Sequence, residues 1–296
     1  MKPLKLKIQE QANLLKVPQP VIEKDYALSY LLAGIGAHPI LSKTLVFKGG
    51  TALKKIYFGD YRFSEDLDFS VINAPIGEAL EKALSEVAES SKQLLNAYGH
   101  FEIQLKRNPE KKAHPRGQEA FNFYVKFPWQ PSNLCRVKVE ITHDEPVVLP
   151  PDKMPILHGY GEELLVEILS YSLEEIVAEK LRSLFQTHQK LVQRGWNRPR
   201  ARDYYDLWHL FRKYHDSLNV KKVLATLHEK CIHRQVSYQS SQDFFTAELV
   251  QEARIHWKDS LRVLVKDLPE CDQVLEETRK FIESLCNSPG TADLIF

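Results

Sequence analysis

The feature that most constrains the fold is the stretch from residue 44 to residue 71, in which a glycine turn separates two apolar segments. Residues 45–47 have the apolar, β-branched character of a buried strand. The turn, Gly-Gly-Thr at 49–51, leads into a short predicted helix. The second apolar segment carries Asp66 and Asp68, and side chains alternate along a strand. The stretch therefore predicts two carboxylates on one strand face, next to a glycine turn.

Two parallel carboxylates repel each other unless a cation lies between them. Mg²⁺ is suited to such oxygen ligands, because it usually takes one or two carboxylates together with substrate phosphates. We therefore predict that Asp66 and Asp68 bind Mg²⁺, with Mn²⁺ as the alternative ion. Gly49, Gly50 and Thr51 are the predicted phosphate-binding residues, since glycine allows close approach and the N–H groups of a helix start attract anions. The simpler alternative is a tight turn followed by two solvated acids.

The motifs in this stretch carry a family resemblance. G-G-T-x-L followed by R-x-S-x-D-x-D resembles the nucleotidyltransferase superfamily, and most of all the AbiEii/AbiGii abortive-infection toxin nucleotidyltransferases. The resemblance extends over most of the chain. It implies an α+β fold, with a nucleotidyltransferase-type mixed sheet and flanking helices followed by a helical C-terminal domain. It also implies an enzyme that moves a nucleoside monophosphate from an NTP to an acceptor.

Composition limits the other possibilities. A chain of 296 residues is long enough for two domains, and we place them at 1–160 and 161–296, after a proline-rich connector at 146–155. The 43% hydrophobic and 27% charged content is typical of a soluble globular protein. The formal net charge of +1 gives no global field that would recruit nucleic acid, so such binding would need a local patch.

The expected location is the cytoplasm, with no membrane partner. The sequence has no run of about 18 apolar residues, and its first ten residues lack an apolar signal core. Its four cysteines are scattered without a C-x-x-C pair, which indicates reduced thiols.

The N-terminal segment, residues 5–36, predicts two helices broken near Pro18 and Pro20. The run Glu-Lys-Asp at 23–25 lies near the start of the second helix, and the family often carries a similar cluster there. We expect its acids to interact favourably with the helix dipole in the first turn.

The middle of the chain predicts a helix at 76–98 and three alternating strands at 100–106, 120–127 and 134–142. Alternation of apolar and polar residues indicates a sheet with one covered face. The basic loop at 107–120 suits a mobile element near a nucleic acid, although simple solvation is the commoner explanation for such a loop.

Glu140 lies on the polar face of the third strand. Nucleotidyltransferases commonly place a third acid beside the metal pair, and a carboxylate there helps to deprotonate the attacking hydroxyl. Glu140 is our candidate for this acid. Lys138 shares its face, so an ordinary ion pair is an equal alternative.

Lys180 falls on the apolar stripe of a helix that follows the capping-box sequence Ser-Leu-Glu-Glu at 172–175. A buried lysine is costly unless it meets an anion, and a nucleotide phosphate would serve. The alternative is that the side chain snorkels along the helix edge to water.

Asp203 repeats this anomaly on the next predicted helix, which begins near Arg202. A common polar cleft would explain both buried charges; a helix cap or a pair with a neighbouring arginine is the alternative for Asp203. The segments AEKLRSL and ARDYYDLWHL resemble the E-K-L and R-D-x-x-D-L motifs of the family. The resemblance implies that Lys180 and Asp203 are needed for activity in a cleft between the domains. Pro199 stands where the family often has a basic residue, which is a departure.

Lys54 follows the glycine turn by about one helical turn and is placed to reach a β- or γ-phosphate. Resemblance to the family's turn motif favours Lys54 over Lys55, which we expect to point outward, and over Lys48, which precedes the turn.

The motifs are compatible with more than one kind of acceptor. Resemblance implies RNA, with the tRNA 3′ end as the best candidate, and a toxin role with a separately encoded antitoxin. The near-neutral charge argues against broad, tight RNA binding. A small-molecule nucleotidyltransferase, a protein nucleotidyltransferase and a nucleotide-binding regulator without turnover stay open. The presence of Asp66, Asp68 and Lys180 counts against the regulator.

Overall fold

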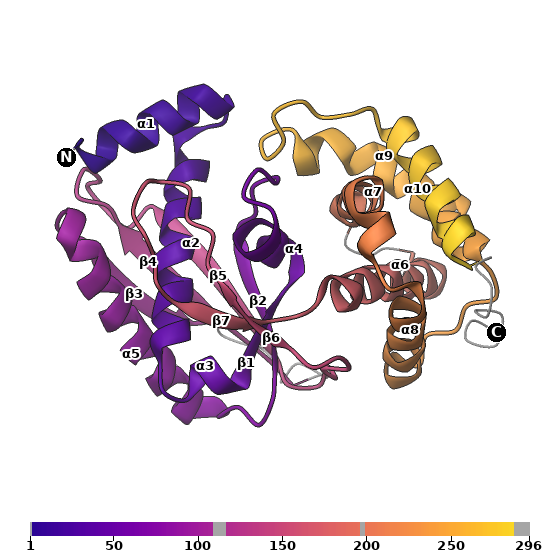
Figure 1. Ribbon diagram of the computed structural model, residues 1–296, viewed down its shortest axis with the longest axis horizontal. Coiled ribbons are helices and arrows are strands. Elements are labelled where there is room, and N and C mark those ends of the chain that lie inside the picture. The colour runs from indigo at the N-terminus through magenta and orange to yellow at the C-terminus, as the bar shows by residue number, and fades with distance from the viewer. Residues whose placement is uncertain (1, 109–116, 196–198, 287–296) are drawn as a thin grey trace. The chain divides into compact units, whose positions relative to one another are not determined.

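The computed structural model describes residues 2–108, 117–195 and 199–286 (Figure 1). The chain divides into two compact units, residues 1–171 and 172–296. The first contains a mixed sheet with helices, and the described part of the second is helical. The division falls after Tyr171 rather than near residue 160, because the last strand, β7 (Glu167–Ser170), belongs to the sheet of the first unit.

In the described residues the sheet has seven strands in the order β3-β4-β5-β2-β1-β7-β6. The strands are β1 (Leu45–Lys48), β2 (Asp66–Val71), β3 (Glu102–Arg107), β4 (Gln118–Lys126), β5 (Cys135–Thr142), β6 (Asp152–Pro155) and β7 (Glu167–Ser170). The pairs β2–β5 and β1–β7 are parallel and the other pairs are antiparallel. The predicted mixed sheet is confirmed, and β6 lies within the predicted extended connector.

The helices of the first unit are α1 (Leu4–Leu15), α2 (Gln19–Ala37), α3 (Leu41–Thr44), α4 (Gly49–Ala52) and α5 (Gly77–Leu95). Those of the second unit are α6 (Leu173–Arg194), α7 (Ala201–Tyr214), α8 (Val220–Arg234), α9 (Ala247–Leu261) and α10 (Cys271–Cys286). The predicted break between two N-terminal helices is confirmed, since α1 ends before Pro18 and α2 begins after it.

Helices α2 and α5 cover one face of the sheet (Figure 1). The alternating apolar residues of β2, β4 and β5 are buried there, among them Leu67, Phe69, Phe121, Phe123, Val137 and Val139. Phe69 pairs with Phe47 of β1, and their ring centroids lie 5.3 Å apart. Because side chains alternate, Asp66 and Asp68 project from the opposite face of the sheet.

Helix α4 continues into a π-helical turn over Leu53–Tyr57, and both lysines of this turn are buried. The Lys55 ammonium lies 2.6 Å from Asp25 Oδ2 in α2 and donates to the Ser29 hydroxyl at 2.9 Å. The expectation that Lys55 points outward is therefore wrong. Its side chain is buried because it meets a carboxylate inside the protein.

The acids of the Glu23-Lys24-Asp25 run do not lie in the first turn of α2, so the helix-dipole explanation is also wrong. Both carboxylates are buried and hydrogen-bonded instead. Glu23 accepts from Trp129 Nε1 at 2.8 Å and from Gln130 Nε2 at 2.7 Å. These contacts attach α2 to the segment between β4 and β5.

Asp25 is the acid that connects α2 to the helix after the glycine turn. Burial alone would raise its pKa, but the charges of Lys55 and Lys54 and hydrogen bonds from Lys55 and Tyr160 lower the pKa below its ordinary value. Asp25 is consequently ionised at neutral pH. A carboxylate with a lowered folded-state pKa contributes stability above its unfolded pKa of about 3.9, and this contribution is lost as the pH falls through the folded-state pKa.

We predict that Lys55→Met lowers the free energy of unfolding of the first unit by about 3–5 kcal/mol at pH 7, because it leaves the buried Asp25 charge without its principal cation. Urea denaturation measures the change. The double variant Asp25→Leu/Lys55→Met should recover most of the loss. Lys24→Met removes a more exposed ion pair with Glu65 and should cost less than about 1 kcal/mol. A Lys55→Met protein as stable as the wild type would contradict the assignment.

The second unit is stabilised by its own core and capping contacts. Ser172 caps α6 by accepting from the Glu175 N–H at 3.2 Å, as predicted. The Glu175 carboxylate is fully buried and lies 2.9 Å from the Lys230 ammonium of α8. The ring of Phe185 in α6 stacks on that of Phe244, with centroids 3.8 Å apart.

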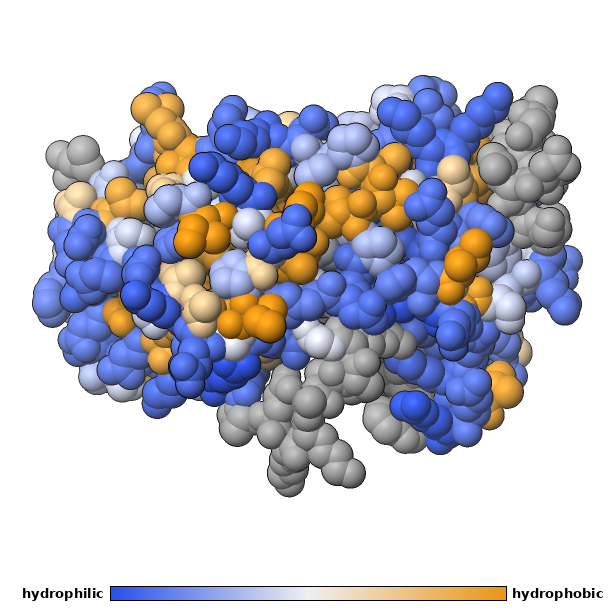
Figure 2. Space-filling model, turned by 90° about the horizontal axis from the view of Figure 1, so that it is seen from below, coloured by the Kyte–Doolittle hydropathy of each residue, from blue (hydrophilic) through white to orange (hydrophobic). Residues whose placement is uncertain are grey.

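The described helices include none that is long and apolar enough to cross a membrane. On the face drawn in Figure 2, hydrophilic residues cover much of the surface and hydrophobic residues are interspersed among them.

Candidate active site

The glycine turn and the acid pair lie in direct contact. Gly49 has φ +81°, a conformation that favours glycine, and a Cβ added to it would lie 2.7 Å from Asp68 Oδ2. Lys48 and Asp68 are cross-strand partners, and Asp66 precedes Asp68 on the same face of β2. The structure therefore brings the predicted metal ligands to the predicted phosphate-binding turn.

The second glycine of the turn contacts a cation. A Cβ added at Gly50 would lie 2.5 Å from Arg62 Nη2 and 3.5 Å from Ser64 Oγ. The Arg62 side chain is buried, and its Nη1 donates to the Phe63 carbonyl at 3.1 Å. Arg62 and Ser64 belong to the R-x-S-x-D-x-D pattern, but the sequence reasoning gave them no role. Their position beside Gly50 depends on how the loop before β2 folds back.

Thr51 connects the turn to β2. Its side chain is buried, and its hydroxyl donates to the backbone carbonyl of Asp66. The hydroxyl hydrogen of Thr51 is therefore donated inside the protein and not to a ligand. A phosphate at this residue would be bound by the backbone N–H, one of the donors that a helix start leaves without an intrahelical acceptor.

Lys54 has a different environment from the one expected of a phosphate ligand. Its ammonium donates to the carbonyls of Gly59 and Tyr61 at 3.1 and 3.0 Å, and burial lowers its pKa. These contacts shape the loop that carries Arg62. Counted from Gly49, the family spacing G-G-T-x-L-x-K ends on Lys55 and not on Lys54.

Glu140 lies beside the acid pair, because β2 and β5 are parallel and Asp68 is its register partner. The Oε1 atom of Glu140 accepts from Lys138 Nζ at 2.6 Å and from Gln118 Nε2 at 2.7 Å. The structure therefore shows both features that the sequence suggested: a third acid next to the pair, and an ion pair with Lys138.

The donor set at this site fits a magnesium ion. Asp66 and Asp68 offer hard carboxylate oxygens, and Mg²⁺ usually completes its shell with waters and substrate phosphates. Within residues 2–108, 117–195 and 199–286, no three or more His, Cys, Asp or Glu side chains are grouped to hold a metal by themselves. A two-carboxylate site that is completed by the nucleotide is consistent with this arrangement.

The second unit holds a separate group of charges, the Lys180 cluster, which consists of Lys180, Arg200, Asp203 and Asp206. The Lys180 ammonium lies 2.8 Å from Asp203 Oδ1 and 2.6 Å from Asp206 Oδ2. Arg200 Nη1 lies 3.2 Å from Asp203 Oδ2. The two residues that the sequence singled out are thus brought together as an ion pair. Asp206 is the partner to which the sequence reasoning gave no role.

Burial would raise the pKa of Asp203, but the charges of Lys180 and Arg200 lower it below its ordinary value. Asp203 is therefore ionised at neutral pH and acts as an acceptor rather than a general acid. The Asp203 side chain is 15% exposed, whereas that of Asp206 is 0% exposed. Arg198, which the sequence places among the arginines near Asp203, lies outside the described residues, and so do residues 109–116 of the basic loop.

A family model described as "Nucleotidyl transferase AbiEii toxin, Type IV TA system" matches residues 30–279. The chain belongs to this family. The matched span contains the glycine turn, the acid pair and the Lys180 cluster. The protein is accordingly a nucleotidyltransferase toxin of a type IV toxin–antitoxin system, and the expected family and enzyme class are confirmed.

Among solved structures, this AbiEii-family chain is similar to MenT4, a nucleotidyltransferase toxin from Mycobacterium tuberculosis H37Rv. The TM-score is 0.59 at 22% sequence identity, and the match covers 94% of this chain and 88% of that chain. The two proteins therefore share a fold. No curated protein sequence matches the chain.

We predict that Gly49→Ala lowers the rate of nucleotidyl transfer about 100-fold, since the new methyl group would displace Asp68, and a displacement of about 1 Å has an effect of this size. An alanine held in this left-handed backbone conformation should also lower the free energy of unfolding by roughly 1–3 kcal/mol. Gly59→Ala is the matched control, because a Cβ there meets nothing within 4 Å. Pyrophosphate release and thermal unfolding measure the two effects. Equal rates for the two variants would contradict the proposed contact.

Proposed function

We propose that this AbiEii-family protein transfers a nucleoside monophosphate from an NTP to RNA in a Mg²⁺-dependent reaction, with the tRNA 3′ end as the acceptor. The observation that carries the proposal is the contact between Asp68 and Gly49. The Asp68 carboxylate, which we propose as a metal ligand, lies directly against a turn that is suited to phosphate. Nucleotidyl transfer needs both in one place, because the ion that the carboxylates would hold would neutralise charge on a phosphate bound beside them.

The reacting groups are assigned as follows. Asp66 and Asp68 would hold Mg²⁺ or Mn²⁺, and the bound ion would neutralise charge as pyrophosphate leaves. Gly49 and Gly50 let the backbone approach the triphosphate, and the Arg62 guanidinium beside Gly50 is suited to bind a phosphate oxygen.

In the transfer itself, the acceptor hydroxyl oxygen forms a bond to the α-phosphorus, and the bond from that phosphorus to the bridging oxygen breaks to release pyrophosphate. The hydroxyl proton goes to Glu140, the register partner of Asp68. The Lys138 ammonium and the Gln118 amide hold one oxygen of that carboxylate in place. Lys54 contributes by ordering the loop that carries Arg62.

We further propose that Lys180 and Asp203 of the second unit are needed for transfer, Lys180 as a phosphate-binding cation and Asp203 as its ionised partner. The proposal rests on the ion pair between Lys180 of α6 and Asp203 of α7, and Asp203 is the more exposed of the two acids that contact Lys180. Asp206 is sealed from solvent and serves to hold the Lys180 ammonium.

The biological setting follows from the family. We propose that a separately encoded antitoxin counteracts the protein, and that the protein acts in the cytoplasm on cellular RNA.

The test incubates the full chain with each α-labelled NTP, total RNA and Mg²⁺ or Mn²⁺. We expect label in tRNA with at least one NTP, and none when the metal is chelated. Asp66→Asn and Asp68→Asn should each lower labelling about 1,000-fold, because they remove several kcal/mol of charge stabilisation. Asp152→Asn, on the exposed edge strand β6, should label as the wild type does.

If the label enters a protein or a small molecule, the proposal of an RNA acceptor is wrong, and the chain is a protein or small-molecule nucleotidyltransferase. Full labelling by Asp66→Asn would overturn the metal assignment. The same assay with Asp203→Asn, a variant that keeps the shape of the side chain, tests the contribution of the second unit.

A further inference from the structure

The face of the sheet that carries the acid pair continues beyond it across three more strands. Asp66 of β2 is the register partner of Lys138 in β5. Lys138 is in turn the partner of Asn122 in β4, and Asn122 is the partner of Lys106 in β3. Register partners point to the same side of a sheet. These four residues therefore form one row, and strand spacings of about 4.8 Å place Lys106 roughly 14 Å from Asp66.

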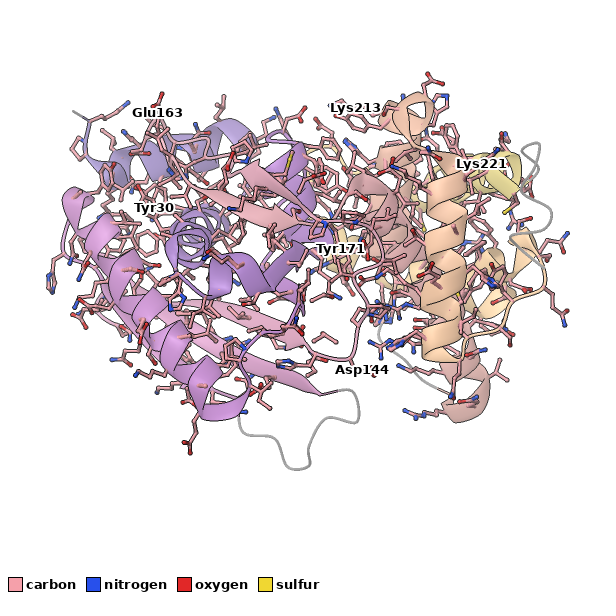
Figure 3. The ribbon with its side chains drawn as sticks, turned by 60° about the horizontal axis from the view of Figure 1, so that its bottom comes forward. Tyr30, Asp144, Glu163, Tyr171, Lys213 and Lys221 are labelled. Carbon is pink, nitrogen blue, oxygen red and sulfur yellow. The ribbon has the colours of Figure 1, made fainter. Side chains whose placement is uncertain are left out.

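The neighbouring row on the same face contains an aromatic ring between two polar side chains. Arg136 of β5 is the register partner of Tyr124 in β4, which is the partner of Gln104 in β3. The Lys106 ammonium lies 5.3 Å from the centroid of the Tyr124 ring. Two cations from two strands thus flank one ring. Arg136 lies on the strand that ends just before Asp144, which is labelled in Figure 3.

The charges of this face are unevenly balanced. Lys138 is paired with Glu140, and Lys126 is paired with Glu102. Lys106 and Arg136 are exposed, and among the described residues neither has a carboxylate within ion-pair distance. The face therefore has carboxylates at β2 and uncompensated positive charge, with a half-buried tyrosine, toward β3.

We propose that Lys106, Tyr124 and Arg136 form an acceptor strip, which binds the single-stranded 3′ segment of the RNA and directs its terminal hydroxyl to Asp66 and Asp68. The inference rests on the proposed function and adds the surface that would bind its substrate. Single-stranded nucleic acid is bound by cations that follow the backbone and by aromatic rings on which bases stack. The open face of a β-sheet is a common platform for such stacking.

The position of the strip favours a polymer over a small acceptor. Lys106 lies three strands from Asp66, farther than a small molecule bound at the acid pair would reach, whereas a chain of nucleotides would pass over Arg136 and Tyr124 to Lys106. The ring between the two cations suits a base between two phosphates, and this combination favours RNA over a protein acceptor.

Fluorescence anisotropy with the full-length protein and a labelled single-stranded RNA of about ten nucleotides tests the strip. Lys106→Gln and Arg136→Gln should each weaken binding several-fold and reduce the slope of log K against log salt by about 1, because each removes a phosphate contact. Tyr124→Leu should weaken binding about tenfold with little change in this slope, because it removes stacking. Lys153→Gln, on the exposed strand β6 at the other edge of the sheet, should change neither quantity.

Steady-state transfer separates this inference from the proposed function. The strip variants should raise the KM for RNA while the KM for NTP stays within about twofold of wild type. If label enters RNA and the strip variants match Lys153→Gln in both assays, the strip is wrong although the transferase function stands. If label enters no RNA, the proposed function fails, and the strip loses its role as an acceptor surface with it.

Discussion

The alternation of acidic and apolar residues along β2 is the constraint on which the candidate site depends. Leu67 lies between the two acids and Phe69 follows them, and both apolar side chains are buried under the helices. The two carboxylates therefore lie on the other face of β2. A slip of one residue in register would bury the acids and expose the apolar pair, so the core fixes the side on which the charges emerge. The hydrophobic alternation of one strand thereby determines where a divalent cation can be held.

The glycine turn meets this pair because two separate contacts fix its position. Gly49 lacks the Cβ that would collide with Asp68, and the Thr51 hydroxyl attaches the turn to the backbone of β2. Farther along the same helix, Lys55 forms a buried ion pair with Asp25. Buried ion pairs contribute little net stability compared with apolar packing, but breaking one is costly. We infer that the value of this pair lies in holding the turn in one orientation relative to α2.

Local sequence patterns predicted most of the fold. Alternation of apolar residues gave the strands from β3 to β5 and the side on which Glu140 lies, and the Ser172 cap marked the start of α6. Most of the missed features of the fold depend on contacts between distant residues. The partner of Lys55 is 30 positions away, and no periodicity indicates that a π-helical turn buries two adjacent lysines. The end of the first unit was missed because β7 becomes part of the sheet only by pairing with β1 and β6.

The candidate site was predictable to a similar degree. The motif residues were identified because glycine turns and alternating acids have local signatures. Two contacts were not identified: the Arg62 guanidinium beside Gly50, and the Asp206 carboxylate that pairs with Lys180. Each contact depends on how a loop or a helix packs against its neighbour. The sequence predicted a charge on each of two helical stripes, and the structure shows that these charges pair with each other.

The most direct test of the central claim is anomalous diffraction from crystals grown with Mn²⁺ and a non-hydrolysable NTP analogue. The account predicts an anomalous peak within about 2.0–2.4 Å of oxygens of both Asp66 and Asp68, with the triphosphate against Gly49 and Gly50. A metal bound elsewhere while the nucleotide occupies its site, or a triphosphate away from the glycine turn, would contradict it.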